Sequence, residues 1–251
     1  KIKQHQAPLD KGGLEGVYLM ECKGLKKKEL LFNDGTPSIL LMPHQDDKVS
    51  ISINAQVKEF HSAWVSFGEL HNTYMEIPPN LDYLVVIRFK EYAFFELFGM
   101  SPEAFANKPI FNLHDFVNHS VVDEILKSYA LEDPQERVRF LTTYLSGIEL
   151  KDSYPKLLKD IVDIIGKQDK PLSVSDLSTI FKLPINEKWI QRSFKKYIGI
   201  SPKKYLKMHR FIRVHDQLEK YNSDSKLAIA LDHGYYDDNH FIKDFKLITG
   251  F

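Results

Sequence analysis

Four polar side chains recur at helical spacing in the last third of this 251-residue chain. The intervals i, i+3, i+4 and i+7 place them on one stripe of a helix, and they are Lys188, Gln191, Arg192 and Lys195. Another side of the same helix is apolar, with Trp189, Ile190, Phe194 and Tyr197. Lysine and arginine can reach guanine O6 and N7 or a phosphate, and glutamine can pair bidentately with adenine. The stripe therefore suits contact with DNA, and the alternative is an ordinary solvated helix surface.

A second segment of the same kind follows near the C-terminus. Phe241 and Phe245 are one helical turn apart, which predicts that both face the core. Asn239, His240 and Lys243 then point in other directions. Asp237 precedes this helix and is a candidate N-cap. The segment is a second candidate for contact with DNA.

The elements that must position these side chains are all helical. The apolar periodicity predicts helices over 173–181, 187–197, 203–221 and 226–231, and a last helix that runs from Asp237 through Phe245. Residues 182–184 form a break, Asn186 is a candidate N-cap, and Gly199 ends the helix that follows. Gly234 supplies a turn in which we expect a positive φ. Two helix–turn–helix units therefore flank one long helix, an arrangement that can enter successive major grooves about 34 Å apart.

The first ninety residues read as β-structure instead. Short apolar or alternating runs predict strands at 17–20, 30–32, 38–42, 49–54, 63–67, 75–77 and 84–89, with a turn at Asn33, Asp34 and Gly35. A helix that Gly99 can end follows near residue 95, and further helices are expected over 115–130, 134–148 and 154–165. The polar stretch 166–171 is the expected linker. We therefore expect domains at 1–165 and 170–251.

Charge is distributed unevenly although the chain carries 34 basic and 34 acidic residues. Residues 1–169 hold 19 Lys and Arg against 25 Asp and Glu, whereas residues 170–251 hold 15 against 9. Within 187–213 there are nine basic residues and one acidic residue, Glu187. A neutral protein with one basic end can bring that end alone to a polyanion.

Other classes of function find little support in the sequence. No run approaches the length of a membrane span, no secretory signal is visible, and Cys22 is the only cysteine, which excludes an internal disulfide. His44, His61 and His71 are 17 and 10 residues apart, which is no familiar spacing of metal ligands. Neither a nucleophile elbow nor a phosphate-binding loop appears. We expect no catalytic residues, no metal and no cofactor, and we expect Cys22 to be a buried apolar side chain.

Two ordered motifs carry a resemblance to a known family. Residues 190–202, together with residues 234–246 followed by Thr249 and Gly250, resemble the AraC/XylS family of bacterial transcription regulators across 172–251. More loosely, 86–89, 95–99 and 113–115 are similar to the cupin-like domain that precedes this module. The resemblance implies contacts with bases or nearby backbone from Lys188, Gln191 and Arg192, and from Asp238, Asn239 and Lys243. Asp238 departs from the family, where an uncharged polar residue is more usual, and phosphates repel a carboxylate.

The expected protein is α+β, with an N-terminal cupin-like β-barrel and trailing helices followed by an all-α domain of two helix–turn–helix units joined by a long helix. Its expected function is sequence-specific regulation of transcription in the bacterial cytoplasm. The DNA-binding residues would be Lys188, Gln191, Arg192, Lys195, Asp238, Asn239, His240 and Lys243. Expected partners are double-stranded promoter DNA, a small-molecule effector, RNA polymerase and a second copy of the chain. The effector and its binding residues cannot be named from the sequence.

One alternative stays open at this point. The chain could instead be a cupin-type enzyme or binding protein for a small molecule, with a helical accessory domain. The paired helix–turn–helix separates the two, because such an enzyme would have no use for it.

Overall fold

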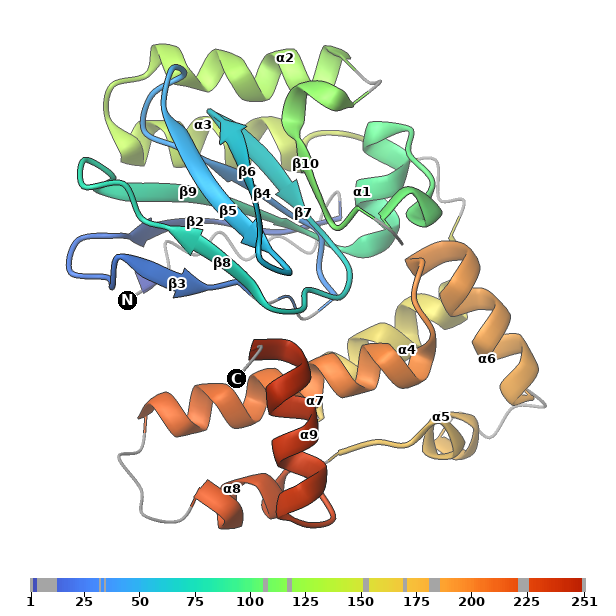
Figure 1. Cartoon of the computed structure of the whole chain (residues 1–251). Coiled ribbons are helices and arrows are strands. Elements are labelled where there is room, and N and C mark those ends of the chain that lie inside the picture. Colours follow the sequence, from blue (N-terminus) through green and yellow to red (C-terminus); the bar gives the residue numbers. More distant parts are fainter. Residues whose placement is uncertain are drawn as a thin grey trace.

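Two antiparallel sheets form the N-terminal part of the molecule (Figure 1). The structure is a computed structural model, and it describes residues 2–3, 13–31, 33, 35–105, 108–116, 119–150, 154–168, 171–180, 186–220 and 226–249. The six-stranded sheet consists, in spatial order, of β1 (Ile2–Lys3), β2 (Leu14–Glu21), β9 (Tyr83–Phe89), β4 (Ser38–Leu41), β7 (Ala63–Ser66) and β10 (Ile110–Asn112). The four-stranded sheet consists of β3 (Lys28–Leu30), β8 (Thr73–Glu76), β5 (Lys48–Ile53) and β6 (Gln56–His61).

Strand alternation divides the buried side chains between two clusters. Along β9, Val85, Ile87 and Phe89 join the cluster that the helices cover, whereas Leu84 joins the cluster between the sheets. Every fully buried member of the second cluster is at most 5% exposed, and its members are Cys22, Met42, Val49, Ile51, Phe60, Trp64, Leu70, Met75, Leu81, Leu84 and Ile110. Side chains therefore fill the space between the sheets. The expected burial of Cys22 is confirmed.

The α+β class is as predicted, except that the two sheets are not closed into the expected β-barrel. No described strand of one sheet pairs with a strand of the other. The chain leaves β6 and enters β7 through Ser62, whose φ of 41° turns the backbone sharply, so that the two strands belong to different sheets. The Ser62 carbonyl accepts a hydrogen bond from the Met42 amide at 2.8 Å, which fixes this corner. The sheets thus stack face to face.

Helices cover the outer face of the six-stranded sheet. They are α1 (Glu91–Phe98), α2 (His119–Lys127) and α3 (Pro134–Ser146), whereas α4 (Lys156–Lys167) packs against the helices of the C-terminal part (Figure 1). Gly99 ends α1 with a φ of 63°, as predicted. The helix predicted over 115–130 is shorter in the structure, where it corresponds to α2. The reason is that residues 113–115 and 128–130 form 3-10 turns. Arg137 of α3 is buried and donates to the carbonyls of Pro43 and Leu131, at 2.9 and 3.0 Å, so it joins α3 to the end of β4.

The C-terminal part is entirely helical where it is described. Its helices are α5 (Val174–Ile180), α6 (Glu187–Ser193), α7 (Pro202–Lys220), α8 (Lys226–Asp232) and α9 (Asp238–Thr249). The predicted break at 182–184, the turn residue Asp34 and the terminal Gly250 lie outside the described residues. No helix in the described ranges is both long enough and apolar enough to cross a membrane.

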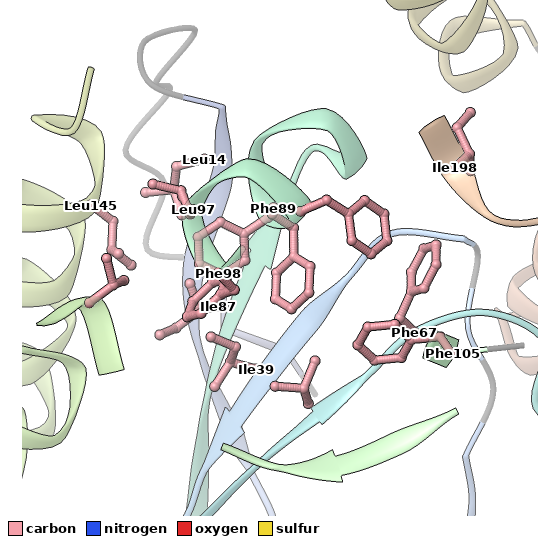
Figure 2. Packing of buried hydrophobic residues seen from close by; sticks show 14 of the residues in the cluster. Leu14, Ile39, Phe67, Ile87, Phe89, Leu97, Phe98, Phe105, Leu145 and Ile198 are labelled. Carbon is pink, nitrogen blue, oxygen red and sulfur yellow. The ribbon is translucent and has the colours of Figure 1, made fainter. Parts of the chain in front are cut away.

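The largest hydrophobic cluster extends through both parts of the chain. It joins Phe67, Phe89 and Phe98 of the N-terminal part to Ile190 and Ile198 of the C-terminal part. Figure 2 shows this packing, with Leu145 of α3 on one side and Ile198 on the other. The first helix–turn–helix unit is therefore built into the core of the sheet domain.

Candidate DNA-binding surface

The first unit presents its polar stripe on α6. Asn186 caps this helix as predicted, because its Oδ1 accepts a hydrogen bond from the Trp189 amide at 2.9 Å. Ile190 and Phe194 are fully buried and fix which side of the helix faces the core. The side chains of Lys188, Gln191, Arg192 and Lys195 are all exposed.

The end of this helix differs from the prediction. Residues 194–198 form a π-helical turn, which the Gly199 amide closes by donating to the Phe194 carbonyl at 3.0 Å. A wider turn rotates the residues that follow relative to those before it. Lys195 accordingly lines a cavity beside the sheet domain, whereas Lys188, Gln191 and Arg192 precede the wide turn. We name these three the α6 reading face.

Several cations of α7 are already engaged within the molecule. Lys204 pairs with Glu69 at 2.7 Å, and Lys207 pairs with Asp244 at 2.9 Å. The Arg213 guanidinium donates to the Ile165 carbonyl at 2.8 Å. By contrast, the side chains of the α6 reading face make no polar contact with any residue that the structure describes. This face, like the exposed Lys195 and Lys203, is available to a polyanion.

The second unit folds around a short turn. Gly234 has a φ of 80°, as expected, and a Cβ there would lie 2.4 Å from Pro171 Cγ. Asp237 caps α9 as predicted, since its Oδ1 accepts from the His240 amide at 2.7 Å. Phe241 and Phe245 face inward, with the Phe245 ring 6.2 Å from that of Phe211 on α7. The helix continues to Thr249, beyond the predicted end at Phe245.

The predicted contact residues of the second unit occupy different positions. Asn239 and Lys243 are exposed on α9. The His240 ring packs against Tyr235 at 5.1 Å, and its Nε2 lies 4.0 Å from Asp244, so it faces its own unit. The backbone of Asp238 begins α9, and its side chain lies outside the described residues.

Asp244 and Glu69 are residues that the sequence reasoning missed. Asp244 is only 6% exposed, and its pair with Lys207 fixes α9 against α7. Glu69 sits between Lys204 and His71, and hydrogen bonding to His71 together with Lys204 lowers its pKa to about 2. Asp244 follows Phe241 by three residues, a spacing that could have placed it beside the buried stripe. No local pattern could have found Glu69, because its partner lies 135 residues away.

Other candidate sites are not assembled in this structure. Among the described residues, no three His, Cys, Asp or Glu side chains are placed to hold a metal ion. Burial raises the pKa of the Cys22 thiol to about 11, so that this thiol is not activated as a nucleophile.

Comparison with known proteins supports the helical part most directly. Residues 182–251 match the model of a family described as a helix-turn-helix domain. Among solved structures, the chain is similar to ToxT from Vibrio cholerae O395, with 12% identity, a TM-score of 0.46, and coverage of 94% of this chain and 93% of that one. It is also similar to the AraC-like transcriptional activator CuxR, with 13% identity, a TM-score of 0.25, and coverage of 82% and 73%. No curated protein matches the chain.

The structural likenesses are remote, so the class of protein rests on the helix–turn–helix domain and on the two units that form it. These define a DNA-binding regulator of transcription. The match over residues 182–251 agrees with the resemblance to the AraC/XylS family that the sequence motifs carry.

Proposed function

We propose that this regulator reads DNA with the α6 reading face first and with Asn239 and Lys243 of α9 second. The observation that carries the proposal is that Lys188, Gln191 and Arg192 are exposed on a capped helix of the helix–turn–helix domain, without a polar partner inside the described molecule. Residues near the start of a recognition helix are those that reach base edges in the major groove.

The other predicted residues take subordinate roles in this proposal. Lys195 lies within the π-helical turn and suits a phosphate better than a base edge. His240 packs on Tyr235 and orders the start of α9. Asp238 is at the start of α9. There its negative charge interacts favourably with the positive end of the helix dipole, but DNA phosphates would repel it.

Selection of bound sequences from a random pool of duplex DNA, using the full chain, tests the function. We expect an enriched sequence with two half-sites about one turn apart, and an affinity that falls steeply as salt increases. Recovery of no preferred sequence would contradict the proposal, and conversion of a small molecule by the chain would favour the cupin-type enzyme.

A cavity between the two parts of the chain supports an effector as well. Its volume is about 480 Å³, within the usual range for small-molecule sites. Phe67, Pro102, Phe105 and Ile200 give it apolar walls. The Glu69 carboxylate also lines it, already paired with His71 and Lys204, and the Lys195 ammonium lines it without a polar partner among the described residues. We propose that it takes a compact, largely apolar molecule with one anionic group. One related structure contains ToxT from Vibrio cholerae with an unsaturated fatty acid bound.

A panel of small carboxylic acids added to the protein–DNA complex tests this site. Ile200→Trp would fill the cavity and should abolish any change in DNA affinity that an acid causes. Ile180→Trp, at an exposed position on α5, is the matched control and should respond like the wild type. An equal response of Ile200→Trp would contradict this location.

Two further partners follow from the family and are proposed on that basis. A second copy of the chain would place two regulators on one promoter, which analytical ultracentrifugation tests. RNA polymerase is the partner through which a regulator in the bacterial cytoplasm would act. We assign no catalytic activity.

A further inference from the structure

The two helix–turn–helix units are attached to the molecule in different ways. The first contributes Leu177, Ile190, Phe194 and Ile198 to the large cluster that it shares with the sheet domain. The second has a separate small cluster, whose buried members are Val214, Ala230 and Tyr235. Apolar packing therefore fixes the first unit to the sheet domain, and the second unit depends on other contacts for its position.

The sheet domain contacts the second unit at the carboxyl end of α9. The Asn72 amide donates to the Ile248 carbonyl at 2.8 Å, and the Tyr74 hydroxyl donates to the Thr249 carbonyl at 2.5 Å. Ile248 and Thr249 are 5% and 3% exposed, and Tyr74 is 9% exposed, so these bonds are shielded from water. Burial also raises the pKa of Tyr74, which keeps its hydroxyl protonated as a donor.

These two bonds meet a need of the helix itself. The last four carbonyls of an α-helix have no partner within the helix and require donors from elsewhere. In α9, an amide and a hydroxyl from the start of β8 supply two such donors, across a sequence separation of 175 residues for the Tyr74 bond. The sheet domain therefore caps a recognition helix of the other domain.

The recognition helix of the first unit also ends against the sheet domain. A Cβ at Gly199, which closes that helix, would lie 2.7 Å from Pro102 Cβ and 2.9 Å from the Pro102 carbonyl oxygen. Figure 1 shows both α6 and α9 running toward the sheets at their carboxyl ends. Their capped starts, at Asn186 and Asp237, are the opposite ends, and these carry the candidate base-reading residues.

We propose that Asn72 and Tyr74 position the second recognition helix relative to the first, and so determine which spacing between DNA half-sites the protein accepts. The pair acts as a cap supplied by the sheet domain, which we name the β8 cap. Its residues touch no DNA and are positioning residues. This inference rests on the proposed function, because it concerns the geometry of the same DNA-binding surface.

Tyr74→Phe is the direct test, since it removes one hydroxyl and keeps the ring. The matched control is Tyr144→Phe on α3, which removes a hydroxyl from the far side of the sheet domain. Fluorescence anisotropy of the full chain would be measured on duplexes whose two half-sites are moved apart or together by one base pair. Each step rotates one half-site by about 34° and shifts it by about 3.4 Å.

We expect wild type and Tyr144→Phe to lose at least about tenfold in affinity at each one-base-pair step, and Tyr74→Phe to lose several-fold less. Amide hydrogen exchange, measured in parallel, should be faster at Asn72 and over 245–249 in Tyr74→Phe. The inference would be overturned if the affinity of Tyr74→Phe fell with each change of half-site spacing as steeply as that of the wild type. This holds whether or not amide hydrogen exchange becomes faster. Failure of the wild type to bind any DNA would instead overturn the proposed function, so the two failures are distinguishable.

Discussion

Tyr205 of α7 donates a hydrogen bond of 2.7 Å to Glu91 of α1, and both side chains are almost completely buried. The bond joins the long helix between the two units to the first helix of the sheet domain. Gly35 lies against the same tyrosine, because a Cβ there would be 2.6 Å from Tyr205 Cε2. The sheet domain thus holds α7 through a buried hydrogen bond within an apolar core.

Tyr205→Phe should therefore destabilise the full chain. The substitution leaves the buried Glu91 carboxyl group without this donor, and such a loss costs about 1–3 kcal/mol. Urea unfolding at neutral pH measures the change. Tyr236→Phe, at a tyrosine that is 88% exposed, is the control and should change the free energy of unfolding by less than about 0.5 kcal/mol. Equal stability of the two variants would show that the Tyr205 bond contributes nothing.

Arg192→Ala should weaken specific DNA binding by about 1–3 kcal/mol and relax the preference at one base pair. The reason is that its guanidinium is exposed on the α6 reading face and can bond a guanine bidentately. Competition titrations with the selected sequence and single-base variants measure both effects. Arg139→Ala, at an exposed arginine of α3, should bind as the wild type does. Loss of affinity with an unchanged base preference would reassign Arg192 to a phosphate contact.

Gly234→Val should destabilise the second unit by more than about 2 kcal/mol. A β-branched residue strongly disfavours the φ of 80°, and its Cβ would overlap Pro171. Thermal unfolding followed by circular dichroism checks this. Gly166→Ala on α4 is the matched control, because a Cβ there meets nothing within 4 Å and should be neutral or stabilise by up to about 1 kcal/mol. A wild-type melting temperature for Gly234→Val would refute the assignment.

Acid should weaken the contact between the sheet domain and α7. The pKa of Glu69 is about 2 in the folded chain and about 4.5 for an ordinary glutamate, so the folded state favours the charged form. Its stabilising contribution is complete above the ordinary pKa and is lost as pH falls through about 4.5 toward 2. Urea unfolding between pH 6 and pH 2 should thus show a shallower pH dependence for Glu69→Gln than for wild type. If the free energy of unfolding depended on pH equally in the two proteins, Glu69 would not be held in its charged form.

Local signals in the sequence predicted the elements that carry the DNA-binding surface. The caps Asn186 and Asp237 and the turn at Gly234 are set by neighbouring residues, so pattern and propensity suffice to find them. The seven predicted strands also correspond to strands of the structure, because apolar alternation marks a half-buried strand. Which side chains bind DNA is still a prediction.

Other features depend on information that is not local. Strand β6 was missed because most of its residues are exposed, so that its sequence lacks apolar alternation. The separation into two stacked sheets depends on the corner at Ser62, where serine gives no signal for a positive φ. The π-helical turn at 194–198 and the bonds from Asn72 and Tyr74 to α9 arise from packing between distant segments. The helical periodicity of the sequence predicts neither the π-helical turn nor these bonds.

The unequal attachment of the two units has a consequence for exchanging parts between relatives of this protein. Residues 226–249 bring most of their own small apolar cluster and meet the sheet domain mainly through backbone carbonyls, which any sequence provides. That half can be grafted from another regulator if the new sequence keeps Gly234, which lies against Pro171, and Asp244, which pairs with Lys207. Residues 174–206 supply side chains to the interior of the sheet domain, so a transplanted copy would leave cavities or overlaps there. Recombination within this fold should therefore diversify the second recognition helix more readily than the first.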